Sequence, residues 1–238
     1  MKKWIAVLLA AVTCAALLAS CKQEKTDWEY IEDKGSMVMG ITLYEPMNYY
    51  DENGKLTGFE TEFAEAVCKK LGVKAEFQVI DWEQKETELK SRTIDAIWNG
   101  LTVTPERREN MAFSTPYISN KQVVVTRKEN LEKYSTLAGM AGASVTAENG
   151  SAGEAAIQAS DVLSKNSYVA SAAQKDVLLE VKAGTSELGV VDVVMAMASI
   201  KDGTDYADLA IVSGVELTAE EYAIGLRLED TALLAKIN

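Results

Sequence analysis

Two polar groups stand five residues apart within the stretch 94–118 and could together hold a small charged molecule. Thr102 ends a loop of small residues, Asn99-Gly100-Leu101-Thr102, that follows the apolar run 94–98. Arg107 lies close enough in sequence to reach back over that loop. A planar guanidinium is the best protein partner of a carboxylate, because its N–H groups match the two oxygens. With the backbone groups and the hydroxyl of the loop, this combination suits a free α-amino acid.

The same stretch carries a longer pattern. It contains Asp95-Ala96, the small-residue loop, Arg107 and the run Phe113-Ser114-Thr115-Pro116-Tyr117. This pattern resembles the core signature of the bacterial extracellular binding proteins that deliver polar amino acids to ABC transporters (solute-binding protein family 3). The resemblance covers the chain from about residue 36 to its last residue. It implies an α/β fold of the periplasmic-binding-protein type II class, with two lobes, a ligand cleft between them and a two-strand hinge.

The resemblance places the ligand's carboxylate on Arg107 and on the backbone amides of Ser151 and Ala152. These two residues precede a predicted helix, and free N–H groups at a helix start attract anions. The alternative for Arg107 is a solvated surface residue. The alternative for Ser151 is a helix N-cap with Glu154 three residues further on, and this role is compatible with ligand binding.

The resemblance also places the ligand's ammonium on Asp192, which follows a short apolar strand. The Thr102 hydroxyl and the Gly100 carbonyl would accept the remaining ammonium hydrogens. A carboxylate opposite Arg107 completes the recognition of a zwitterion. The alternative for Asp192 is an N-cap of a helix that begins at Val193.

The remaining candidates would contact the ligand's side chain. The resemblance places Tyr44 and Trp82 on either side of the carbon skeleton, whereas the alternative for both is the hydrophobic core. Asn99 and Glu45 could contact a polar ligand side chain. Ile41 stands where relatives selective for basic amino acids can carry Asp, which argues against a basic ligand.

Apolar periodicity predicts alternating strands and helices, which favour parallel sheets. Strands are expected at 38–41, 75–80, 94–98, 122–126, 145–147, 188–191, 210–212 and 222–226. Helices are expected from Phe59 to a stop at Gly72, at 82–92, after Glu154, from 174 to a stop at Gly184, and from 229 to 237.

Composition excludes several classes of function. The 238 residues carry a formal net charge of −12, which repels phosphate backbones, so nucleic acid is not an expected partner. The chain has no histidine, which removes His-dependent nucleophile pairs and most catalytic zinc sites. It has no G-x-x-x-x-G-K-[ST] motif, so any ATP-driven step belongs to another protein. We expect neither a cofactor nor a metal.

The N-terminus is typical of an export signal. Two lysines precede the apolar run 5–19, and Leu18-Ala19-Ser20-Cys21 resembles a lipobox. Lipidation of Cys21 would anchor the protein outside the cytoplasm on the cell membrane, whereas the alternative is an ordinary signal peptide. Cys68 lies in an apolar helical pattern and is expected to be a small buried hydrophobic residue.

The expected organisation is a signal peptide at 1–20, a tether at 21–35, lobe one at 36–120, lobe two at 121–218 and a return to lobe one at 219–238. In relatives the chain crosses between lobes near 119–122 and again near 216–221, and the final helix continues for a few more turns. The C-terminal part of this chain therefore looks truncated.

The predicted function is extracytoplasmic binding of a free amino acid and its delivery, by hinge closure, to the permease subunits of an ABC importer, without catalysis. A ligand-sensing module on the same fold is one alternative. A second is an enzyme similar to a periplasmic dehydratase of cyclohexadienyl acids, which needs a carboxyl general acid such as Glu45 or Glu148 in the cleft. Which amino acid binds is left open.

Overall fold

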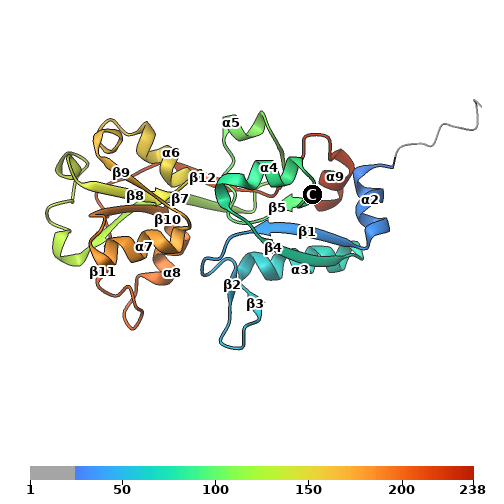
Figure 1. Cartoon of the computed structure of the whole chain (residues 1–238), viewed down its shortest axis with the longest axis horizontal. Helices are drawn as coiled ribbons and strands as arrows, with labels where there is room; N and C mark the ends of the chain where they lie inside the picture. The colour runs from blue at the N-terminus through green and yellow to red at the C-terminus, as the bar shows by residue number, and fades with distance from the viewer. Residues whose placement is uncertain (1–24) are drawn as a thin grey trace, which may run out of the picture.

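The computed structural model describes residues 25–238, which form two α/β lobes placed one after the other along the longest axis of the molecule (Figure 1). The predicted signal peptide and Cys21 lie outside the described residues. Within 25–238, no helix is both long and apolar enough to cross a bilayer.

Lobe one is built on a five-stranded sheet. In spatial order its strands are β4 (Lys74–Val79), β1 (Ser36–Ile41), β5 (Ala96–Ile97), β13 (Gly225–Leu226) and β6 (Ala112–Phe113). Strand β1 pairs in parallel with β4 and β5, while β13 pairs antiparallel with β5 and β6. The other elements are the hairpin β2 (Tyr49–Tyr50) and β3 (Leu56–Thr57), the helices α3 (Phe59–Leu71), α4 (Lys85–Lys90) and α5 (Pro105–Arg108), and the 3-10 turn η1 (Trp82–Gln84). Because β13 lies within this sheet, the end of the chain rejoins lobe one.

Lobe two has a sheet of the same mixed kind. In spatial order its strands are β11 (Leu209–Ile211), β7 (Ile118–Arg127), β10 (Leu188–Asp192), β8 (Ser144–Glu148) and β9 (Ser167–Ser171). Strand β8 is parallel to β9 and β10, while β7 is antiparallel to β10 and β11. The helices of this lobe are α6 (Ala152–Ala159), α7 (Gln174–Ala183) and α8 (Val193–Ser199), with the 3-10 turns η2 (Lys128–Asn130), η3 (Ala138–Met140) and η4 (Leu163–Lys165).

Two strands cross between the lobes and pair with each other (Figure 1). The first half of β7 lies antiparallel to β12 (Ala219–Tyr222), with Lys121 opposite Ala219 and Ile118 opposite Tyr222. The second half of β7 continues into the sheet of lobe two. This pair is the two-strand hinge that the α/β two-lobe prediction required.

The predicted elements are mostly present, with boundaries that shift by a few residues. The strand expected at 222–226 is two strands, because the chain turns from the hinge into the lobe-one sheet at residues 223–224. Helix 82–92 begins as a 3-10 turn, and α8 begins at Val193, where the alternative for Asp192 placed a helix. The elements that were not predicted include α5, β6, β9 and the β2–β3 hairpin.

Helix α3 ends at Gly72, as predicted, and its apolar residues Phe63, Val67 and Leu71 pack partly buried against the lobe-one core. Phe59 is 48% exposed, whereas Glu60, Thr61, Ala64 and Cys68 are buried. The inner face is therefore partly polar. Burial raises the pKa of Cys68 to about 11, as expected for the buried residue that the sequence predicted.

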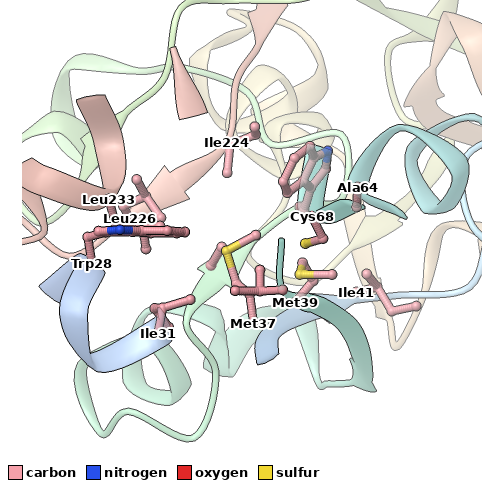
Figure 2. Close-up of a cluster of buried hydrophobic side chains, with 13 residues drawn as sticks. Trp28, Ile31, Met37, Met39, Ile41, Ala64, Cys68, Ile224, Leu226 and Leu233 are labelled. Atoms are coloured by element: carbon pink, nitrogen blue, oxygen red, sulfur yellow. The ribbon is translucent and has the colours of Figure 1, made fainter. Parts of the chain in front are cut away.

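The stretch 27–34, predicted as part of the tether, is instead a helix of lobe one. Helix α2 (Asp27–Lys34) begins with a capping box between Thr26 and Glu29 and ends at Gly35 in the left-handed conformation. Trp28 and Ile31 are buried in the lobe-one core together with Leu233 (Figure 2). The segment is charged on its outer face, and this composition concealed the two buried side chains.

Helix α2 packs against the last helix, α9 (Thr231–Ile237), and also caps it. The Asp27 carboxylate accepts hydrogen bonds from the backbone N–H groups of Leu233, at 2.6 Å, and Ala232, at 3.4 Å. A carboxylate at a helix start is favourable because the N–H groups there have no intrahelical acceptors. The apolar face of α9 is therefore covered by a segment from the other end of the chain.

We expect Trp28→Ala to lower the free energy of unfolding by about 3 kcal/mol, because it removes a large buried aromatic side chain. Urea unfolding followed by fluorescence would measure this loss. Tyr30→Ala is the matched control, since Tyr30 lies on the same helix but is 43% exposed. Equal unfolding midpoints for the two variants would contradict the packing of α2 on lobe one.

Candidate functional site

A cleft between the lobes brings together nearly all of the predicted ligand residues. Lobe one contributes Trp82, Asn99, Gly100, Thr102 and Arg107, and lobe two contributes Glu148, Ser151, Ala152, Gln174 and Asp192. Of the residues predicted to contact the ligand, Tyr44 and Glu45 do not line this cleft. Residues separated by up to 110 positions in the chain thus meet where the strands of the two lobes end.

Arg107 is not a solvated surface residue. It lies on the short helix α5, whose N-cap Thr104 accepts a hydrogen bond from the Arg107 backbone N–H. Its side chain donates to the Thr102 carbonyl at 2.8 Å and, across the cleft, to the Gly150 carbonyl at 3.2 Å. The guanidinium fork is therefore held at the boundary between the lobes, where a carboxylate could replace a carbonyl as its acceptor. Neighbouring Arg108 is exposed and stacks on Phe113.

At the start of α6, Ser151 has the N-cap role that was the alternative to ligand binding. Its hydroxyl caps the helix by accepting from the Glu154 backbone N–H, while Glu154 accepts from the N–H of Gly150. The Ser151 N–H donates to the Glu148 carbonyl at 3.2 Å, so it is already engaged. Ala152 is the first helical residue, where the N–H has no intrahelical acceptor. Of the two predicted amides, that of Ala152 is the better placed for an anion.

Asp192 occupies the N-cap position of α8, but its side chain does not cap the helix. The carboxylate instead accepts hydrogen bonds from the side-chain amides of Asn120, at 2.8 Å, Gln122, at 2.5 Å, and Gln174. The N-cap alternative is therefore wrong for the side chain. Three amide donors hold this carboxylate in place on the lobe-two wall, opposite Arg107.

Tyr44 supports the site from behind. It is buried in a cluster with Met47 and Tyr222, and its hydroxyl contacts Gly100 so closely that a Cβ at Gly100 would lie 2.1 Å from it. Gly100 also has φ +56°, which favours glycine. Tyr44 therefore fixes the loop rather than lining the cleft, contrary to the prediction.

The other side-chain candidates divide into two groups. Trp82 is buried and lines the cleft, with the Lys85 ammonium 4.9 Å from its ring centroid. Asn99 also lines the cleft, but its amide oxygen accepts from the Thr42 N–H and from Asn48, and its nitrogen donates to the Thr42 hydroxyl. Asn99 thus mainly orients its own loop.

Two residues used in the specificity argument lie away from the cleft. Glu45 is exposed. Ile41 is fully buried in the lobe-one core (Figure 2). Since Ile41 does not face the cleft, its apolar side chain carries no argument against a basic ligand.

Glu60 is a buried carboxyl that sequence reasoning missed. Its two oxygens accept from the Gly100 N–H at 2.7 and 2.9 Å, and it also accepts from Tyr117 and Asn48. Burial raises its pKa to about 7, although these hydrogen bonds oppose the shift. A polar residue inside an amphipathic helix would have been the only sequence signal. Gln174, at the first position of α7, likewise gave no distinctive signal.

Glu148 and Lys85 complete the electrostatics of the cleft. Glu148 is 2% exposed, and burial followed by repulsion from Asp192 raises its pKa to about 8. Burial and the charge of Arg107 lower the pKa of Lys85 to about 8. Lys85 donates to the carbonyls of Trp82 and Gly150, each at 3.0 Å. The Gly150 carbonyl therefore accepts hydrogen bonds from both Lys85 and Arg107.

The buried acids should make the protein more stable at pH 5 than at pH 8. Burial raises the pKa values of Glu60 and Glu220 to about 7 and that of Glu148 to about 8. In the unfolded chain these carboxyls have their ordinary pKa of about 4.5. Their stabilising contribution is complete below that value and is lost as the pH rises through 7–8, by an amount on the order of a few kcal/mol.

Urea unfolding at pH 5 and pH 8 would measure this change in the free energy of unfolding. Glu148→Gln should flatten the dependence, because it removes one of the titrating groups. Greater stability at pH 8 than at pH 5 would contradict the predicted direction.

The cleft pairs a guanidinium and a helix start with a carboxylate on its opposite wall, which is an arrangement that can hold both charges of a zwitterion. Among residues 25–238, no three or more Cys, Asp or Glu side chains are grouped so that they could hold a metal ion.

Comparison with known proteins gives a consistent result. Residues 37–238 match the model of the bacterial extracellular solute-binding proteins, family 3. The probable ABC transporter extracellular-binding protein YckB of Bacillus subtilis is 36% identical over 137 residues, which cover 53% of this chain and 47% of that protein. The chain thus spans about half the length of the curated relatives that it matches.

Solved structures match over a larger share of the chain. The substrate-binding protein of an ABC uptake transporter from Streptococcus pneumoniae, with bound histidine, is 33% identical, with a TM-score of 0.82 and coverage of 91% of this chain and 89% of that one. The arginine-bound form of truncated ArgBP from T. maritima is 31% identical, with a TM-score of 0.81 and coverage of 88% and 96%. The two-lobed α/β fold is therefore confirmed.

Proposed function

This chain belongs to family 3 of the bacterial extracellular solute-binding proteins, and we propose that it binds a free amino acid outside the cytoplasm and delivers it to an ABC-type importer. The zwitterion lies between the lobes. Its carboxylate is bound by Arg107 and the Ala152 amide, and its ammonium by Asp192 with the Thr102 hydroxyl and the Gly100 carbonyl. The permease subunits recognise the closed form.

One observation carries this proposal. The Arg107 guanidinium of lobe one and the Asp192 carboxylate of lobe two line the same cleft. Within residues 25–238, the lobes are joined covalently only at the two hinge crossings. A ligand that contacts both charges favours the closed arrangement, because it gains both contacts only when the lobes are together. Similar proteins are described as bound to histidine and to arginine, which supports an amino acid as the ligand class.

Native mass spectrometry of the purified protein, followed by calorimetry with the common amino acids, tests the proposal. We expect saturable binding of at least one free amino acid with one-to-one stoichiometry. X-ray scattering should show a smaller radius of gyration when that amino acid is added. If none of the common amino acids binds, the proposal is wrong.

A second candidate function is favoured by one feature of the cleft. Glu148 lines it with a pKa raised to about 8, so this carboxyl can carry a proton at neutral pH, as a general acid must. The alternative is therefore a dehydratase of a cyclohexadienyl acid. Turnover of such an acid by the purified protein, abolished by Glu148→Gln, would favour the enzyme, whereas saturable binding without turnover favours the binding protein.

We further propose that a lipid on Cys21 anchors the protein to the cell membrane. The lipobox-like Leu18-Ala19-Ser20-Cys21 supports this proposal. Cys21→Ser should move the protein from the membrane fraction to the soluble extracytoplasmic fraction. Labelling with a fatty acid measures the modification directly, and an unlabelled wild-type protein would contradict the proposal.

A further inference from the structure

Glu148 is the charged group of the cleft that zwitterion binding leaves unused. It is the last residue of β8 and lines the cleft on the lobe-two side, three residues before Ser151. Its side chain is buried, yet its Oε1 atom has no hydrogen-bond partner among the described residues. A buried carboxylate oxygen without a donor is costly. The other cleft acid, Asp192, accepts three side-chain amides.

The two lobe-one cations beside the cleft, Lys85 and Arg107, form no hydrogen bond or ion pair with Glu148. Lys85 directs its ammonium to the carbonyls of Trp82 and Gly150, and Arg107 directs its fork to the carbonyls of Thr102 and Gly150. Among residues 25–238, neither cation forms an ion pair within 4.0 Å of a carboxylate.

Acids outnumber cations around the cleft. The acidic groups whose charges act on Arg107 are Glu220, Glu86, Asp192 and Glu148. Against these stand the guanidinium itself and Lys85. A zwitterion has no net charge and leaves this excess of acidic groups in place, whereas a ligand with an additional positive charge stabilises their ionised forms.

We propose that Glu148 is a specificity-determining residue that binds a cationic group on the ligand's side chain, so that the preferred ligands are basic amino acids. This inference rests on the proposed amino-acid binding. Glu148 lies on the same wall as Asp192 and Ala152, which bind the two ends of the ligand backbone, so a side chain that extends from that backbone meets it. The Trp82 ring on the opposite wall can pack on the aliphatic part of the side chain.

The test compares ligands that differ in side-chain charge and little else. Calorimetry at pH 8 would measure the affinities of arginine and of citrulline, its neutral near-isostere, and likewise of lysine and norleucine. We expect the wild-type protein to bind arginine at least about tenfold more tightly than citrulline, since a hydrogen bond to a charged group contributes about that factor. Glu148→Gln should bring the ratio close to one by weakening arginine alone.

Glu86→Gln is the matched control. It removes the same charge near Arg107 from a residue that does not line the cleft, and it should leave the arginine-to-citrulline ratio of the wild type unchanged. If Glu86→Gln lowered the arginine-to-citrulline affinity ratio as much as Glu148→Gln, the preference for arginine would come from the overall negative potential of the cleft. That result would overturn the proposed role of Glu148.

The remaining outcomes separate this inference from the proposed function. If the wild-type protein binds neutral amino acids as tightly as basic ones, or more tightly, amino-acid binding stands and the inference is overturned, even if the Glu148 variant does not fold. Equal weakening of arginine and citrulline by Glu148→Gln would place Glu148 on the common backbone part of the ligand and also overturn it. If no amino acid binds the wild-type protein, both proposals fall together.

Discussion

Replacing Arg107 with alanine is expected to lower the affinity for the bound amino acid by about thirtyfold to several thousandfold. This range corresponds to about 2–5 kcal/mol for truncating one member of a buried, hydrogen-bonded charge pair. The ligand's carboxylate would lose both N–H donors of the fork, and the lobes would lose the hydrogen bond from Arg107 to the Gly150 carbonyl. Calorimetry with the amino acid that binds the wild-type protein most tightly would measure the loss.

Two further variants separate geometry from charge. Arg107→Lys keeps the charge but not the planar fork, so its affinity should fall between those of the wild type and the alanine variant. Arg108→Ala removes an adjacent exposed guanidinium and should leave the affinity unchanged. If Arg107→Ala and Arg108→Ala had the same small effect, the carboxylate site would have to lie elsewhere.

Asp192→Asn should be almost as damaging to binding. The variant loses the negative charge opposite the ligand's ammonium, and its own amide hydrogens face the donor groups of Asn120, Gln122 and Gln174. We expect a loss of about a hundredfold or more, within the range for a truncated charge pair. Asp161→Asn is the matched control, because Asp161 is an exposed acid of the same lobe.

A blocked ligand tests the same contact from the other side. An N-acetylated amino acid cannot present an ammonium, so it should bind the wild-type protein as weakly as the free amino acid binds the Asp192→Asn variant. The two changes together should cost little more than either one alone, because both remove the same interaction. Tight binding of the acetylated ligand by the wild type would refute the assignment.

The residues whose role depends on a local motif were predictable from the sequence. Thr102 and Arg107 are five positions apart, so the sequence alone could place them at one site. The resemblance placed Asp192 at the ligand, and this residue ends the short strand β10 and lines the cleft. In each case a short stretch of chain determines the position of the functional group.

Residues that depend on long-range packing were not predictable in the same way. The resemblance placed Tyr44 against the ligand, but its hydroxyl packs closely on Gly100, so the residue stabilises the loop instead. Glu60 is fully buried on α3, although its charged side chain gave no sign of burial in the sequence. In the sequence, Glu148, Lys85 and Arg107 are simply three charged residues. Only the structure shows that both cations donate to carbonyl groups and leave the Glu148 carboxyl without a cationic partner.

The packing of α2 on α9 also determines how far the folded body can move from a membrane. Only the five residues 22–26 separate Cys21 from the start of α2. Even a fully extended chain spans at most about 3.6 Å per residue, so a lipid on Cys21 would keep the start of α2 within about 20 Å of the bilayer surface. Helix α2 lies at the end of lobe one that is furthest from lobe two (Figure 1). The lipid would therefore hold the protein by the far end of lobe one through a short linker. Lobe two could then move only within a limited distance of the membrane surface, where the transporter lies.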